Sequence, residues 1–233
     1  MKAALVRARL VMSVGLLLSL SCAVAPINFY QSGFAPEKSW QIDLSAEGGR
    51  SYDEIVNDTS SKLSASDYTA WMSTGGFWYS PVNRMSFGLQ MESALLGALG
   101  GSLRAKGVLF QTENAAAALL LRAGASSAEA DVWDEHYSYD TQTLTAGSVL
   151  SFGNPKLNLG FGPKLVVGHL NINSDSSGSF RGNVFDYGGF LNGVAVWRCV
   201  KLSGEATLLY IDRPLAGSGA LIPYVGAQAA VIF

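Results

Sequence analysis

Strict alternation of apolar and polar residues over short segments is the clearest pattern in this chain. In residues 40–47 (WQIDLSAE) every even-numbered residue is apolar and every odd-numbered residue is polar. The same alternation returns in residues 85–92 and 202–208. Because successive side chains of a strand point to opposite faces, each segment is predicted to be a β-strand with one apolar and one polar face.

Connections of two lengths separate these segments. Four short, turn-forming stretches occur at residues 80–83, 111–114, 153–156 and 198–201, and polar stretches lie between them near residues 50–65, 125–140 and 173–186. Short turns on one side and longer loops on the other are typical of an antiparallel barrel that crosses a membrane. The pattern therefore predicts an all-β fold, an antiparallel up-and-down transmembrane β-barrel.

The strands are predicted near residues 40–50, 66–79, 84–95, 102–110, 115–124, 141–152, 157–170, 187–198, 201–211 and 222–233. Counts of eight or twelve strands also fit the pattern, because the stretch Ala115–Leu121 does not alternate. An even count places both ends of the barrel on the periplasmic side. Aromatic residues beside the turns, at residues 77–79 and at Trp197, suit the aromatic girdle of a membrane barrel.

The N-terminal residues indicate export. Lys2, Arg7 and Arg9 precede an apolar run over residues 10–20, which gives way to small residues. This order is that of a secretory signal peptide, and the run is shorter than the roughly 20 residues that a spanning helix needs. We expect a signal peptide over residues 1–21, an N-terminal tether over residues 22–39 and the barrel domain over residues 40–233.

Residues 18–22 (LSLSC) resemble a bacterial lipobox, the motif whose cysteine is acylated, although Ser19 stands where the motif usually has leucine. The resemblance implies acylation of Cys22, and ordinary signal-peptide cleavage after Ala23 is the alternative. Acylation would leave Cys199 as the one remaining thiol of the two cysteines. A framework of disulfides is therefore excluded.

The charge balance narrows the range of partners. The full chain has a formal net charge of −2, and loss of three basic residues with the signal peptide would leave 13 basic against 18 acidic side chains, a net charge of −5. Domains that bind nucleic acid carry a basic stripe instead. No nucleic-acid partner is expected.

The last segment carries a more specific signal. One face of it is formed by Val225, Ala227, Ala229, Val231 and Phe233, and the sequence ends at Phe233. The segment resembles the closing strand of bacterial outer-membrane β-barrel proteins. That resemblance implies an outer-membrane location, contact with outer-membrane lipid, and recognition of Val231 and Phe233 by the barrel-assembly machinery. A second resemblance, over residues 18–50, is to a loosely defined class of lipidated barrel proteins and implies architecture rather than function.

The polar face of the predicted strands defines the interior of the barrel. Its charged side chains are Asp43, Glu47, Glu92 and Glu205 against Arg104, Lys106, Arg122, Lys164 and Arg198. A barrel of this size is narrow, and a desolvated charge without a partner costs several kcal/mol. We therefore expect a charge network that neutralises itself, and a plugged lumen rather than an open pore.

Some apolar residues fall on the same inward face by this register. They are Trp71, Val108, Phe110, Val194 and Val196. Either β-bulges or a part-apolar lumen would explain them. The second explanation leaves open a barrel that admits a hydrophobic ligand.

Few residues could carry chemistry. The two histidines, His136 and His169, lie in no recognisable hydrolase motif, and Asp134, Glu135 and His136 would point alternately to opposite faces of a strand. The five acidic residues between positions 129 and 140 could bind a hard cation, but they lack the spacing and the glycine of an EF-hand. We expect no enzymatic activity, no cofactor and no metal site.

These features predict a non-enzymatic outer-membrane β-barrel, lipid-anchored through Cys22, that acts as an envelope scaffold or a surface-exposed interaction protein. A narrow porin or a channel for a hydrophobic ligand is the first alternative. An outer-membrane hydrolase and a soluble periplasmic β carrier are the others.

Overall fold

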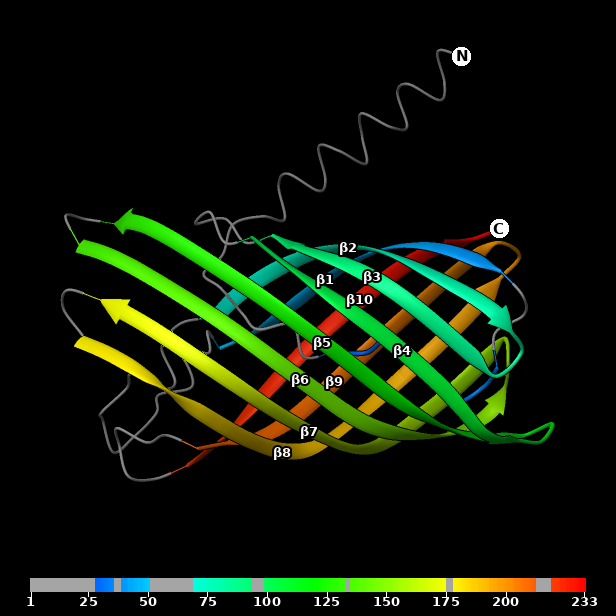
Figure 1. The fold of residues 1–233 in the computed structure, drawn as a ribbon. Helices are drawn as coiled ribbons and strands as arrows, with labels where there is room; N and C mark the ends of the chain where they lie inside the picture. The colour runs from blue at the N-terminus through cyan, green and yellow to red at the C-terminus, as the bar shows by residue number, and fades with distance from the viewer. Residues whose placement is uncertain are drawn as a thin grey trace, which may run out of the picture.

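A computed structural model describes residues 28–35, 39–50, 69–93, 99–132, 135–174, 178–212 and 219–233. Over these residues the chain forms ten strands: β1 (Trp40–Arg50), β2 (Thr69–Val82), β3 (Met85–Ser93), β4 (Leu99–Gln111), β5 (Ala115–Val132), β6 (Glu135–Asn154), β7 (Leu157–Ser174), β8 (Gly178–Trp197), β9 (Val200–Ile211) and β10 (Ala220–Ile232). Each strand pairs antiparallel with the next, and β1 pairs with β10 (Figure 1). The prediction of a closed up-and-down barrel with ten strands is confirmed. No helix in the described part is long and apolar enough to cross a membrane.

The two ends of the barrel differ in their connections. At one end, here named the turn end, short turns at residues 83–84, 112–114, 155–156 and 198–199 join consecutive strands. The barrel is also closed there, because the backbone N–H groups of Trp40 and Phe233 each donate to the other residue's carbonyl oxygen, over 3.2 and 2.8 Å. The opposite end is named the loop end. Both ends of the barrel domain thus lie with the short turns, as an even strand count requires.

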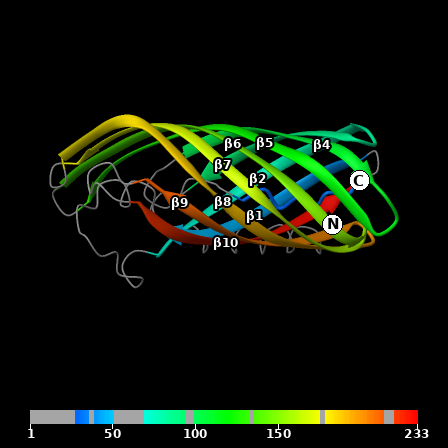
Figure 2. The same ribbon diagram turned by 90° about the horizontal axis from the view of Figure 1, so that it is seen from below.

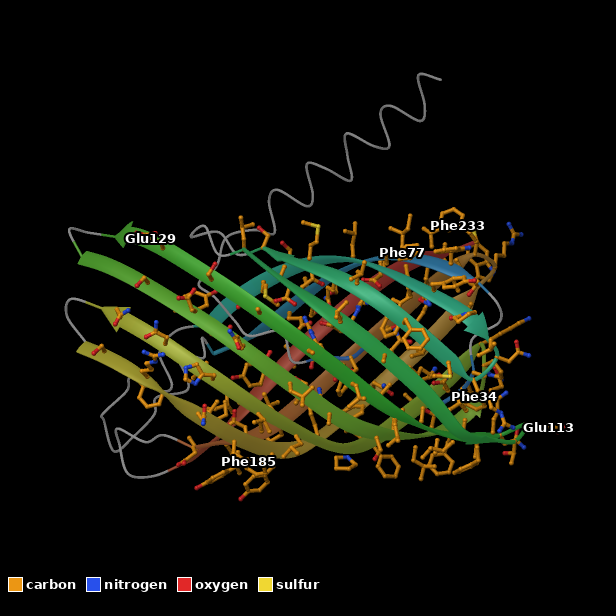
Figure 3. All side chains as sticks on the ribbon, viewed as in Figure 1. Phe34, Phe77, Glu113, Glu129, Phe185 and Phe233 are labelled. Atoms are coloured by element: carbon orange, nitrogen blue, oxygen red, sulfur yellow. The ribbon has the colours of Figure 1, made fainter. Side chains whose placement is uncertain are left out.

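The outer surface is apolar and the interior is polar. In β3, Phe87, Leu89 and Met91 point outward and are about half exposed or more, whereas Gln90 and Glu92 point inward and are buried. In Figure 3 the labelled residues Phe185 and Phe233 project outward from the barrel. A water-soluble protein would bury the apolar set. Only lipid can cover a continuous outer surface of this kind.

The apolar belt has the height of an outer membrane. On β7 every second residue from Leu157 to Val167 points outward, and all of these residues are apolar. The next outward residue is the exposed His169. Ten steps of about 3.3 Å, on a strand tilted by roughly 45°, rise about 23 Å. The apolar band of known membrane barrels is about 25 Å tall. The molecule therefore has the dimensions of a transmembrane β-barrel.

Four strands continue past this belt at the loop end. The polar stretches near residues 125–140 and 173–186, predicted as long loops, lie largely within β5–β8, which have 18 to 20 residues each. In Figures 1 and 2 these strands reach well beyond the others. The prediction was wrong there because alternation marks only strands that separate lipid or core from water, whereas a strand beyond the membrane can be polar on both faces. We name this projection, residues 124–132, 135–143, 168–174 and 178–184, the outer wall.

Both explanations for the inward apolar residues apply. A register shift between Val108 and Phe110 in β4 turns Phe110 outward, where it is exposed. Val108 and Val194 remain inward and buried, so the lumen is part-apolar. The side chain of Trp71 lies outside the described set. The part-apolar lumen also explains why alternation fails in Ala115–Leu121. The inward residues Ala116, Ala118 and Leu120 face an apolar part of the lumen, so both faces of this stretch are apolar.

Candidate functional site

Three ion pairs cross the interior of the barrel. Arg104 of β4 pairs with Asp43 of β1 over 3.0 Å, Arg122 of β5 with Glu92 of β3 over 2.6 Å, and Lys164 of β7 with Glu205 of β9 over 2.6 Å. All six side chains are at most 4% exposed. Each pair joins strands that are not neighbours in the barrel. The pairs therefore link strands that lie two or three positions apart around the wall.

Aromatic side chains near the turn end divide between the two faces. Trp40 stacks on Tyr79 on the outside, with ring centroids 4.1 Å apart. Trp78 points inward instead and is 3% exposed, with the guanidinium carbon of Arg104 4.5 Å from its ring centroid. Trp78 is therefore not part of an interfacial girdle, because its place in the strand alternation turns it toward the lumen.

The described part of the predicted tether lies inside the barrel. We name residues 28–35 the luminal segment. Six of its eight residues are each at most 8% exposed, namely Asn28, Phe29, Tyr30, Gln31, Ser32 and Phe34. Figure 3 places Phe34 close to the turn end. Residues 22–39 were expected to form an N-terminal tether, and the structure places residues 28–35 of that stretch in the lumen. The sequence could not indicate this position, because the segment has no alternation and most of its hydrogen bonds are to residues far away in the chain.

Acidic side chains of the barrel bind the N–H groups of the luminal segment. The carboxylate of Glu205 accepts from the backbone N–H of Phe29 over 3.1 Å and of Tyr30 over 2.7 Å. Glu47 accepts from the backbone N–H of Asn28 over 3.2 Å. Nearer the turn end, Ser151 accepts from the N–H of Gly33 over 2.8 Å.

Basic and amide side chains bind the carbonyl groups of the same segment. Asn192 donates to the carbonyl oxygen of Gln31 over 2.6 Å, and Arg122 donates to that of Asn28 over 3.4 Å. Lys106 donates to the carbonyl oxygen of Phe34. The luminal charged side chains thus form hydrogen bonds with the backbone of the luminal segment as well as ion pairs with one another.

An apolar pocket holds the ring of Phe29. Its walls are Val108, Ala118, Leu120, Val149 and Phe190, all buried. The Phe29 and Phe190 rings meet edge to face, with centroids 6.0 Å apart, and the Lys164 ammonium lies 4.9 Å from the Phe29 centroid. This part of the lumen is therefore lined by apolar side chains and filled by an aromatic ring, in agreement with a part-apolar lumen.

Comparison with known proteins gives similarity of fold only. No protein-family model matches the chain, and no curated protein sequence is similar to it. Similar solved structures include the outer membrane protease OmpT from Escherichia coli (11% identity over 88% of this chain and 98% of that chain, TM-score 0.48) and the translocator domain of autotransporter NalP from Neisseria meningitidis (10% identity, 85% and 88%, TM-score 0.48). Neisserial surface protein A is also similar (11% identity, 84% and 98%, TM-score 0.40). The closed antiparallel barrel is established by the strand pairings themselves and not by these likenesses.

The structure places eight of the nine predicted luminal charges inside the barrel. They are Asp43, Glu47, Glu92, Arg104, Lys106, Arg122, Lys164 and Glu205, all buried. Arg198 is the exception and corrects the prediction. It lies exposed in the turn between β8 and β9, with φ of 55° and its guanidinium over the ring of Trp197, because the strand alternation ends before it.

Two further inward charges were missed. Lys201 is 5% exposed and Asp186 is fully buried. Lys201 was assigned to a turn, yet it continues the period-two series of Ser203 and Glu205, so the alternation itself could have identified it. Asp186 lies in a stretch that was taken for the end of a loop.

Other candidate residues lie apart from this lumen. His169 is on the outer face of β7, where its Nδ1 is 2.8 Å from Oδ1 of Asn183, and the side chain of His136 is outside the described set. Cys199 is exposed in the turn between β8 and β9. Val231 and Phe233 point outward and are exposed. Residues 1–21 and Cys22 lie outside the described residues, and the described residues contain no group of three or more metal-ligating side chains.

Proposed function

We propose that the protein is a non-enzymatic, non-conducting β-barrel of the bacterial outer membrane, which acts as a scaffold that carries the outer wall as a surface for contact with other molecules. The observation that carries the proposal is the filled lumen. Residues 28–35 occupy it, and their backbone is bonded to buried side chains of six or more barrel positions, including Glu47, Glu205 and Asn192. A pore would need that space for water and solute.

The cellular location is part of the same proposal. The apolar belt, the alternating residues of β10 and the signal-like residues 1–21 support export to the outer membrane, with lipid and the barrel-assembly machinery as partners. In this arrangement the turn end faces the periplasm and the outer wall faces outward. Acylation of Cys22 would add an anchor, and loss of acyl labelling in Cys22→Ala tests it.

The outer wall supports a contact role. Beyond the apolar belt its outward residues are polar, and they include Asp140, Gln142, His169, Arg181 and Asn183, each exposed. They are presented on paired strands rather than on loops, since β5–β8 are joined by continuous antiparallel registers up to Val132 and Ser174. Paired strands hold these polar side chains in fixed positions. Less conformational entropy is then lost when another molecule binds, which favours a role in recognition.

Conductance of the purified protein in planar lipid bilayers tests the proposal. We expect no stable open level, because the luminal segment and the ion pairs fill the interior. The same preparation should migrate faster on gels before boiling than after it, which shows that the barrel is folded. Stable, large conductance from heat-modifiable protein would overturn the proposal in favour of a narrow porin.

A further inference from the structure

The barrel recognises the luminal segment mainly through its backbone. Glu205 and Glu47 accept from three consecutive N–H groups, those of residues 28–30. Carbonyl oxygens of residues 28, 31 and 34 accept from Arg122, Asn192 and Lys106. Tyr30 has a left-handed backbone, with φ of 55°, which lets these three successive N–H groups reach the two carboxylates. Contacts of this kind bind any peptide that presents its N–H and C=O groups in the same positions.

Side-chain pockets in the wall add selectivity for aromatic residues. Gly147 lies beside the Phe29 ring, and a Cβ atom at that position would be 2.9 Å from Cε2 of Phe29. Gly226 lies beside Tyr30, where a Cβ atom would overlap the phenol oxygen. Tyr30 is fully buried, and its hydroxyl donates to the carbonyl oxygen of Ala46 over 3.3 Å. The wall is thus hollowed at the two positions where the segment has its adjacent aromatic residues.

The occupant is joined to the barrel by a short chain. Residue 35 of the segment and residue 39, which directly precedes β1, are separated by three residues. A ligand on such a short connection has an effective concentration of about a millimolar or more. It therefore outcompetes a free peptide of similar affinity unless its own contacts are weakened.

We propose that the lumen is a binding site for a short, largely uncharged peptide with two adjacent aromatic residues, and that residues 28–35 are its intramolecular ligand. This inference rests on the closed state proposed above. A peptide supplied from outside takes the same place when the intramolecular segment is weakened. The luminal segment is then a competitor that keeps the site closed, rather than a fixed part of the core.

The double variant Phe29→Ala/Tyr30→Ala tests the inference, because it empties both pockets and leaves every strand unchanged. A synthetic peptide with the sequence of residues 28–35 carries a fluorophore, and its binding to the folded protein is followed by anisotropy. We expect the double variant to bind this peptide at least about tenfold more tightly than the wild type does. A peptide with alanine in place of its three aromatic residues should bind at least about tenfold more weakly.

A matched variant, Phe185→Ala, removes an exposed aromatic side chain from the outer face. It should bind the peptide as weakly as the wild type, and all three proteins must show heat-modifiable migration. Equal binding to the double variant and the wild type, or equal binding of the two peptides, would overturn the inference. Neither result affects the closed state, which is tested separately by wild-type conductance.

Discussion

Replacement of Glu205 by glutamine should destabilise the barrel through the loss of one buried negative charge. Oε1 of Glu205 is 2.6 Å from the Lys164 ammonium, and both side chains are 0% exposed. Its Oε2 accepts from the backbone N–H of Tyr30 over 2.7 Å and of Phe29 over 3.1 Å. Glutamine keeps the shape and an acceptor oxygen but removes the negative charge that lies 2.6 Å from the ammonium.

The magnitude follows from the burial of that ammonium. Breaking a buried ion pair by removing one partner costs about 3–5 kcal/mol, because the remaining charge stays desolvated. The free energy of unfolding should therefore fall by about this amount, which shifts the folding equilibrium by roughly 150- to 4,000-fold. Urea titrations of the protein in phospholipid vesicles, followed by tryptophan fluorescence, measure this change.

A double-mutant cycle isolates the pair. Lys164→Met combined with Glu205→Gln removes both charges, so the double variant should be more stable than the sum of the single effects by about 1–3 kcal/mol. Glu113→Gln, in the exposed turn between β4 and β5, is the matched control and should change stability by less than about 0.5 kcal/mol. A loss below about 1 kcal/mol for Glu205→Gln, or strictly additive effects, would refute the reasoning.

Three further predictions concern the luminal fit, the assembly signal and the orientation. Gly226→Ala adds a methyl group that overlaps Tyr30, so it should lower the free energy of unfolding by about 1–3 kcal/mol in the same urea titrations. Phe233→Ser should reduce the heat-modifiable fraction in purified outer membranes, because the outward aromatic of the closing strand is lost. A bulky, membrane-impermeant maleimide should label Cys199 only after the outer membrane is permeabilised, whereas Asp140→Cys should be labelled on intact cells.

Each of these predictions has its own control. Gly204→Ala adds the same methyl group on the outer face, where its nearest neighbour would be 3.9 Å away, and an equal loss there would contradict the luminal explanation. Phe185→Ser also removes an outward aromatic side chain but not the terminal one, so equal loss of assembly would deny Phe233 a special role. Labelling of Cys199 on intact cells would reverse the proposed orientation.

The alternation of residues was sufficient to predict the barrel but not the length of its strands. Segments such as β3 and β9 alternate because one face meets lipid and the other meets the lumen. Beyond the belt that contrast ends, and Tyr139 and Asp140 of β6 belong to a strand that the pattern assigned to a loop. The outer wall is held by the registers with its neighbouring strands, which a local pattern cannot contain.

The same limit applies inside the lumen. Period two identified Asp43, Arg104 and Glu205 as inward charges, since direction relative to the wall depends only on position along the strand. The ion-pair partners of these residues could not be predicted from position along the strand. The Arg104–Asp43 pair joins residues separated by 61 positions, so it depends on the closure and register of the whole barrel.

The sequence by itself determined the fold class, the strand order and the polarity of the two surfaces, because period-two patterning is a local property that each strand carries. Only the tertiary structure decided what fills the barrel. The luminal segment has no regular pattern of its own, and its bond from Phe29 to Glu205 spans 176 positions in the chain. Its place depends on the closed wall, which brings those distant acceptors and donors together.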